Sequence, residues 1–223
     1  MTDRLVPAPQ PAYRLVPSRF PPIGLFDTVA TAADAAAVME LAGWTNDRLV
    51  AERLDRLPPD QWVYGRPNAS IIMASFLHIA PGGMRFNGPD LGAWYASASI
   101  VTAVAEVGHH LRREAVARSV KTMRRTYRSY TATLSGDYLD LCGKQAEYAD
   151  AYASDSYDGG QVLGEKIRAS TSSGIVFDSL RHQGGCNVVG YRPPGITDVV
   201  QADHFEISIE AASRRIDVRK LSG

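Results

Sequence analysis

Three residues within the stretch Met84–Leu111 carry side chains suited to work on a nucleotide: Arg85, Tyr95 and Glu106. Arg85 stands in the glycine-rich turn GGMRFNGP, where a planar guanidinium can hold a phosphate or carboxylate through two hydrogen bonds. Tyr95 offers an aromatic face, and the small residues Ala96–Ala98 leave room for a ligand beside the backbone. Glu106 can stabilise a cationic centre. Together the three fit a nucleotide whose sugar passes through a positively charged transition state.

Glu106 lies in a helix that we predict from Ile100 to about Arg118, with Ser99 as its N-cap. The apolar stripe of this helix consists of Ile100, Val104, Val107 and Leu111. At 100° per residue, Glu106 lies about 140° from the centre of that stripe, on the face opposite the expected core. An alternative therefore stays open: Glu106 and His110, one turn apart, could be a solvated pair on the outside of an amphipathic helix.

The first twelve residues are predicted to be an extended arm. Three prolines, at positions 7, 9 and 11, exclude helix and sheet alike. A short edge strand is expected next, at Tyr13–Pro17. The domain itself is expected to cover residues 13–223.

A helical insertion is predicted around residues 31–58. Gly43 should divide it, and Thr45 or Asn46 should cap its second helix. The apolar segment Asn68–Pro81 is ambiguous between helix and strand.

Short strands are expected to dominate the remainder of the chain. One strand precedes the Glu106 helix, and another short helix is expected at Tyr157–Ser170. The other predicted strands, rich in β-branched and aromatic residues, are TYRSYTATL, YLDLC, GIVFDSL, NVVGY, HFEISIE and RRIDVRKL, the last two forming a hairpin around AAS. Helices first and a mostly antiparallel sheet last predict a single α+β domain rather than a doubly wound sheet.

Composition narrows the function further. Lys plus Arg and Asp plus Glu both number 24, so no basic excess points to direct nucleic-acid binding. Cys142 and Cys186 lack metal-ligand spacing, which argues against structural zinc, and two reduced thiols are favoured over one disulfide. The N-terminus has no apolar signal segment, and the apolar run Ala69–Ala80 is too short to span a bilayer. We therefore expect a cytoplasmic protein with no membrane association and no metal.

The motifs taken together resemble those of the RES domain family, which is named for its Arg, Glu and Ser. Arg85, Tyr95 and Glu106 match its first part, with YAS before the helix and AVAEV inside it. The later segment GIVFDSLRHQGGCNVVGYRP, Gly174–Pro193, resembles the serine motif and places Ser179 on the family serine. The opening YRLV resembles the N-terminal Tyr-Arg of the family and makes Arg14 a further candidate.

The resemblance implies a fold like that of ADP-ribosyltransferases, a split and mostly antiparallel sheet with NAD in the cleft between its halves. It also implies a growth-arresting toxin of a bacterial toxin–antitoxin pair, which cleaves NAD between nicotinamide and ribose with either water or orthophosphate as the acceptor. NAD would be its substrate and no metal would be needed. The partner would be a small helical antitoxin of the Xre-like kind, which forms a hetero-oligomer with the toxin and occludes the NAD cleft.

The same resemblance gives each candidate residue a role. Glu106 would stabilise the oxocarbenium-like centre, and Arg85 would hold the nicotinamide-side phosphate. Tyr95 would stack on nicotinamide or ribose, and Ser179 would orient Arg85 or the ribose. His110 would orient the carboxylate or move a proton, and Arg14 is a further NAD contact.

Other functions remain open at this stage. The chain could transfer ADP-ribose to a host protein, or it could be a non-enzymatic module that binds an anion or a partner. A serine hydrolase using Ser179 and His182 ranks last, because the G-x-S-x-G elbow is absent. No G-x-G-x-x-G follows a strand, so a Rossmann hydride-transfer enzyme is not supported.

Overall fold

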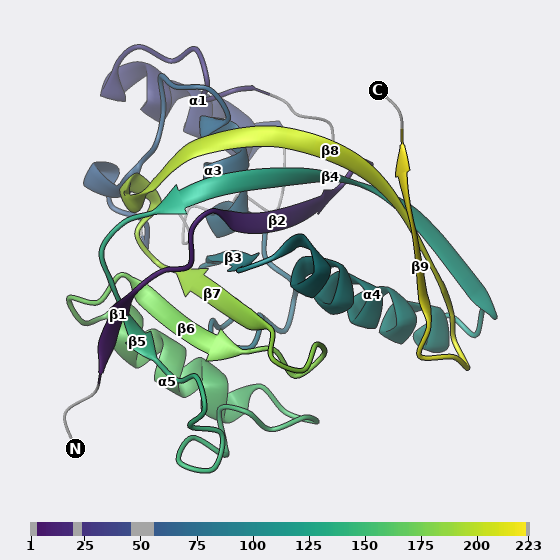
Figure 1. Ribbon diagram of the computed structural model, residues 1–223. Coiled ribbons are helices and arrows are strands. Elements are labelled where there is room, and N and C mark those ends of the chain that lie inside the picture. Colours follow the sequence, from purple (N-terminus) through teal and green to yellow (C-terminus); the bar gives the residue numbers. More distant parts are fainter. Residues whose placement is uncertain (1–3, 20–23, 46–55, 222–223) are drawn as a thin grey trace.

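The computed structural model describes residues 4–19, 24–45 and 56–221 (Figure 1). In chain order the elements are β1 (Leu5–Pro7), β2 (Ala12–Pro17), α1 (Ala32–Thr45), the 3-10 helix η1 (Pro59–Gln61), α3 (Ala69–Leu77), β3 (Trp94–Ser97), α4 (Ile100–Ala117), β4 (Thr122–Leu134), β5 (Asp137–Asp140), α5 (Asp158–Arg168), β6 (Gly174–Asp178), β7 (Cys186–Gly190), the 3-10 helix η2 (Pro193–Gly195), β8 (Ile196–Glu210) and β9 (Ile216–Leu221).

The strands form one sheet in the order β1-β5-β6-β7-β3-β2-β4-β8-β9. Among the described strands, β5 and β6 are the one parallel pair. The predicted α+β class with a mostly antiparallel sheet is therefore confirmed.

The sheet is split where β3 meets β2. That junction pairs one residue of each strand, Tyr13 with Ser97. On one side of it lie β1, β5, β6, β7 and β3, and on the other side the long strands β4 and β8 continue from β2. In Figure 1, β2, β4 and β8 arch over α4, while α5 lies beside β5 and β6. Among the described strands, this is the shortest pairing between neighbours in the sheet.

Among the described residues, three apolar clusters lie between the helices and the sheet. The largest lies under α3 and contains the fully buried Trp94 and Tyr130. A second packs the region around α5 onto β5, β6 and β7, with Phe86 completely buried. The third packs α4 through Leu111 and Ala115 onto β4 and β8. The helices that flank the cleft are therefore each fixed to a different part of the sheet.

Two predictions about the N-terminal strands were wrong. Leu5–Pro7, within the expected arm, pairs with β5 in the sheet. Pro7 is tolerated because β1 is the terminal strand, where a missing N–H costs no ladder bond. The strand expected at an edge, β2, is instead central, because β3 and β4 pair with its two sides.

The structure contradicts one of the helix predictions and resolves another that was ambiguous. Gly43 does not divide the first helix, since α1 runs through it to Thr45. The second helix expected after Thr45 or Asn46 lies outside the described residues. The ambiguous apolar segment is a helix, α3. Its N-terminus is stabilised by the carboxylate of Asp27, which accepts hydrogen bonds from the backbone N–H groups of Asn68 and Ser70.

The two cysteines lie together although 44 residues separate them in the chain. The Sγ atoms of Cys142 and Cys186 are 3.8 Å apart, and both thiols are free and half-buried. In the part of the chain that the structure describes, no helix is long and apolar enough to cross a membrane.

We expect Leu111→Ala to destabilise the fold strongly. The Leu111 side chain is 1% exposed and joins α4 to β4 and β8, so its truncation leaves a cavity. The free energy of unfolding, measured by denaturant titration, should fall by about 2–5 kcal/mol. The control Val116→Ala alters a residue of the same helix that is 60% exposed and should change stability by less than about 0.5 kcal/mol. Equal effects of the two substitutions would contradict this packing of α4.

Candidate active site

A cavity of about 310 Å³ opens where the two halves of the sheet meet. This volume is in the range of ligand-binding sites. Strands β2, β3, β6 and β7 and helix α4 contribute to its walls, together with the loop around Arg85. Five of the six predicted site residues line it: Arg14, Arg85, Tyr95, Glu106 and His110. The sixth, Ser179, lies behind the wall and touches Glu106.

Glu106 is held by two short hydrogen bonds to one carboxylate oxygen. Ser179 Oγ and Asn187 Nδ2 each donate to Glu106 Oε1 over 2.7 Å. Within the described residues Glu106 Oε2 has no hydrogen-bond partner, and Glu106 lines the cavity. One oxygen therefore anchors the carboxylate while the other is left for a ligand.

The alternative of a solvated Glu–His pair is wrong for Glu106. Only Leu111 of the predicted stripe is fully buried, whereas Thr102 and Ala103 are buried on other faces of α4. The turn after β6 packs there, and His182 Nδ1 lies 2.9 Å from Thr102 Oγ1. More than one face of α4 is thus covered, which a single apolar stripe did not indicate.

Asn187 was part of the sequence motif, but its role was missed. Its side chain is 4% exposed and links two site residues. While Nδ2 donates to Glu106, Oδ1 accepts a 2.7 Å hydrogen bond from Ser97 Oγ. Ser97 is also buried and pairs with Asn187 across β3 and β7. The sequence does contain a signal for this contact, because a small polar residue, Ser97, stands just before the helix and an amide residue, Asn187, lies in the serine motif.

Ser179 forms a hydrogen bond with the Glu106 carboxylate and not with Arg85. Its hydroxyl donates to Glu106 and accepts hydrogen bonds from the backbone N–H groups of Arg181 and His182. These two donors fix the position of the oxygen, so the O–H is directed at Glu106. The structure therefore brings Ser179 to the carboxylate, whereas the sequence prediction placed it on Arg85 or the ribose.

Arg85 lies at the tip of a tight turn closed by Met84 and Asn87. Its Nη1 donates to the backbone carbonyls of Ala151 and Ala153 at 2.9 and 2.8 Å. The guanidinium carbon lies 5.0 Å from the centre of the Tyr157 ring, a cation–π distance. Burial lowers the pKa of Arg85 below its ordinary value of 12.5. With Nη1 occupied, Nη2 and Nε are the donors left for an anion.

Tyr95 and Arg14 both form hydrogen bonds with neighbouring parts of the chain. The Tyr95 hydroxyl donates to Asn87 Oδ1 and accepts from the backbone N–H of Phe86, so its polar end holds the arginine turn. Arg14 Nη1 donates to the carbonyl of Tyr95, and its guanidinium lies 4.8 Å from the Trp94 ring centre. Burial lowers the pKa of Arg14 to about 10, so it stays cationic near neutrality. Its Nε has no hydrogen-bond partner among the described residues.

His109, which the sequence did not single out, also lines the cavity. Within the described part of the chain its Nε2 is buried without a hydrogen-bond partner. Burial, followed by the positive charge of Arg181, lowers the pKa of His109 to about 4. His110, the predicted residue, is exposed and packs edge to face on the His109 ring.

Across residues 4–19, 24–45 and 56–221, no group of three or more His, Cys, Asp or Glu side chains could hold a metal ion. The cavity combines the carboxylates of Glu106 and Asp178 with several cationic and aromatic side chains, an arrangement suited to an anionic ligand with an electron-poor centre.

Comparison with known proteins agrees with the motif resemblance. The family model of the RES domain matches residues 53–210. This span includes every candidate residue except Arg14, whose assignment rests on the YRLV motif alone. A comparison with curated proteins gives no match. Among solved structures, the M. tuberculosis MbcT–MbcA toxin–antitoxin complex has a chain that is 21% identical, with 55% of this chain and 73% of that chain covered and a TM-score of 0.41.

The lowered pKa of His109 predicts a pH dependence of stability. The pKa falls from an ordinary 6.5 to about 4 on folding, so between these values the unfolded chain binds a proton that the folded chain does not. Stability should therefore fall as the pH drops from 6.5 towards 4. In an NMR titration, the imidazole signal that His109→Gln removes should titrate near pH 4. The same substitution should reduce the slope of unfolding free energy against pH. A midpoint near 6.5 would contradict this environment.

Proposed function

Because the chain belongs to the RES domain family, we propose that it cleaves NAD at the nicotinamide–ribose bond and acts as the toxin of a toxin–antitoxin pair. The observation that carries the proposal is the Glu106 carboxylate, held through Oε1 and lining a cavity that also contains Arg85. Depletion of NAD would then arrest growth.

Cleavage begins at the bond between C1′ of the ribose and N1 of nicotinamide. The electron pair of that bond leaves with nicotinamide, which departs as a neutral molecule and needs little acid assistance. The remaining ribose carries positive charge shared between C1′ and the ring oxygen. Glu106 Oε2 would stabilise this charge, and the two hydrogen bonds to Oε1 would keep the carboxylate from reorienting. Water then attacks C1′ and loses a proton, giving ADP-ribose.

Arg85 would bind the phosphate nearest the nicotinamide ribose. Its Nη1 is occupied by the carbonyls of Ala151 and Ala153, which fixes the plane of the guanidinium. The remaining two donors form the fork that a phosphate accepts. Arg14 and His110 would contribute further contacts to NAD, and the Tyr95 ring would form the surface beside the ribose or nicotinamide.

The proposed partner is a small helical antitoxin of the Xre-like kind, expected for a toxin of this family. It would form a hetero-oligomer with the toxin in the cytoplasm, where the NAD pool lies, and it would occlude the cleft. Arg85 and Arg181 line the cavity, so an inserted acidic or carboxylate-bearing segment would compete for the phosphate site.

The test of the proposed function is incubation of the antitoxin-free protein with NAD, with and without orthophosphate, followed by mass spectrometry. We expect nicotinamide and ADP-ribose, at a rate indifferent to phosphate. A phosphorylated ADP-ribose with strong rate enhancement would replace hydrolysis by phosphorolysis. If NAD survives with folded protein, the proposal fails, and transfer of ADP-ribose to a protein target becomes the next experiment.

Glu106→Gln should reduce NAD turnover by about a hundredfold or more, the usual scale for one preorganised electrostatic group. The fold should persist, because Gln keeps the shape and the Oε1 acceptor. The matched control Glu210→Gln changes an exposed carboxylate on β8 and should leave turnover unchanged. Near wild-type turnover of Glu106→Gln would remove Glu106 from the mechanism.

Arg85→Lys keeps the charge but loses the planar fork. We expect a higher KM for NAD and loss of growth arrest when the gene is induced in bacteria. Arg214→Lys, an exposed arginine near the start of β9, is the matched control and should remain toxic. Undiminished toxicity of Arg85→Lys and Arg85→Ala would place the anion site elsewhere, with Arg14 and Arg181 next to examine.

A further inference from the structure

Helix α5 binds the backbone of the arginine loop, defined as residues 82–92, along its whole length. Three α5 side chains, spaced four and three residues apart on one helix face, contact successive parts of the loop. Gln161 Nε2 donates to the carbonyls of Gly82 and Met84 at 2.8 and 3.1 Å. Farther along the loop, Glu165 accepts a hydrogen bond from the N–H of Gly88.

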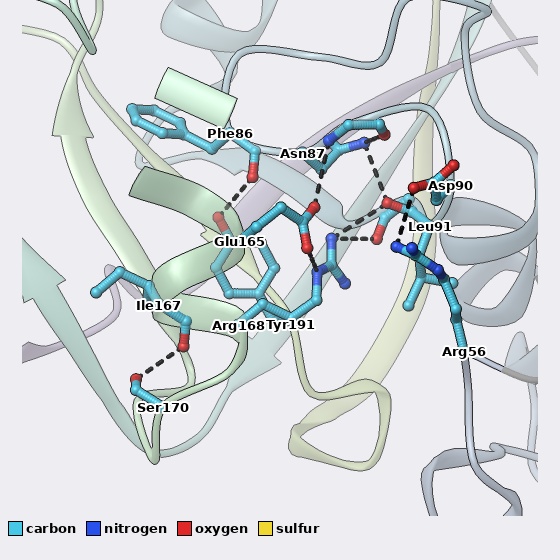
Figure 2. Close-up of polar contacts among 12 residues, drawn as sticks. Arg56, Phe86, Asn87, Asp90, Leu91, Glu165, Ile167, Arg168, Ser170 and Tyr191 are labelled. Carbon is cyan, nitrogen blue, oxygen red and sulfur yellow. Dashed lines mark hydrogen bonds and ion pairs between the residues drawn. The ribbon is translucent and has the colours of Figure 1, made fainter. Parts of the chain in front are cut away.

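The third side chain, Arg168, binds the carboxyl end of the loop. Its Nη2 donates to the carbonyls of Leu91 and Gly92 at 3.2 and 2.9 Å, and its Nε pairs with Glu165. Figure 2 shows Glu165 and Arg168 side by side over the ring of Tyr191, facing Asn87 and Leu91. The Tyr191 hydroxyl donates to the carbonyl of Phe86 over 2.8 Å. The loop backbone is therefore bound mainly by side chains.

Two glycines of α5 allow this close approach. A methyl group at Gly160 would collide with the carbonyl oxygen of Arg85, and one at Gly164 with that of Phe86. The turn before the helix packs equally tightly, since a methyl group at Gly159 would lie 2.6 Å from Cβ of Asp150. That turn supplies the Ala151 and Ala153 carbonyls for the Arg85 guanidinium. One unit, the turn plus α5, thus holds both the backbone and the side chain of Arg85.

We propose that Gln161 is a positioning residue that aims Arg85 at the phosphate of the dinucleotide. It bonds the carbonyls on both sides of Gly83, whose φ of +72° gives the loop its bend just before Arg85. Gln161 does not line the cavity, so its effect on a ligand must pass through the loop. The proposal rests on the proposed NAD-cleaving function for its kinetic consequence, but not for its structural one.

The test is Gln161→Glu, which replaces the two-bond amide donor by a carboxylate that repels both carbonyls. We expect the KM for NAD to rise about tenfold with kcat within about twofold, the scale of losing one or two neutral hydrogen bonds. The matched control is Val162→Ala, in the same turn of α5 but with a side chain that is 74% exposed. It should leave both constants unchanged.

A double-mutant cycle separates positioning from general structural damage. In an Arg85→Ala background, Gln161→Glu should raise KM no further, since its effect passes through Arg85. An equal rise in both backgrounds would overturn the proposal, as would an unchanged KM in the single variant.

Hydrogen exchange supplies a readout that needs no NAD chemistry. The amides of Met84 and Asn87, which close the arginine turn, should exchange faster in Gln161→Glu than in wild type or Val162→Ala, with the amides of β4 unaffected. Faster exchange with no NAD cleavage by the wild type would mean that the proposed function fails while Gln161 still holds the loop. Unchanged exchange would overturn the positioning role whatever the kinetics.

Discussion

The site depends on one interaction, the pair of hydrogen bonds that converge on Oε1 of Glu106. Glu106 comes from α4, which packs on β4 and β8, while Ser179 and Asn187 come from the end of β6 and the start of β7. The two bonds therefore join the two halves of the split sheet across the cleft. Among the described residues the sheet halves share one backbone pairing at their junction, Tyr13–Ser97, and the side-chain bond from Arg14 to the Tyr95 carbonyl. The hydrogen bonds of Glu106 add a further link between the halves, beside the cavity.

The partners of Glu106 are themselves fully constrained, which gives the carboxylate its fixed orientation. Ser179 Oγ accepts from two backbone N–H groups, so its single proton has one remaining direction, toward Glu106. Asn187 is oriented by Ser97, because the hydroxyl bound to Oδ1 turns the amide N–H₂ toward the carboxylate. The Asn187 amide and the Ser179 hydroxyl are buried. A polar group without a hydrogen-bond partner lowers the free energy of unfolding more when it is buried than when it is at the surface.

The sequence could predict residues that line the candidate site, but not most of their contacts. Arg85, Tyr95 and Glu106 lie in one short stretch, and an arginine, a tyrosine and a glutamate each indicate the chemistry of the side chain directly. The bond between Ser179 and Glu106 joins residues 73 positions apart, so local spacing carries no signal for it. The same limit explains β2, which has an ordinary edge-strand pattern and becomes central only through pairing with distant β3 and β4. The helix of Glu106, by contrast, was predictable because its N-cap and period are local, and Ser99 does accept from the N–H of Thr102.

The carboxylate of Glu106 and the guanidinium of Arg85 are held in place by different elements of the fold. Glu106 is supported by α4 and the β6–β7 hairpin, whereas the Arg85 loop is supported by α5 and the turn before it. The two supports meet in the second apolar cluster, where Phe86 of the loop packs on Phe177 of β6. Of the hydrogen bonds to Glu106 in the described residues, none comes from α5 or the arginine loop, so we expect changes in α5 to shift the proposed anion-binding fork of Arg85 while the carboxylate keeps its hydrogen bonds. Under the proposed function, phosphate binding and bond cleavage would therefore depend on different elements, so a chain of this fold could adjust one without rebuilding the other.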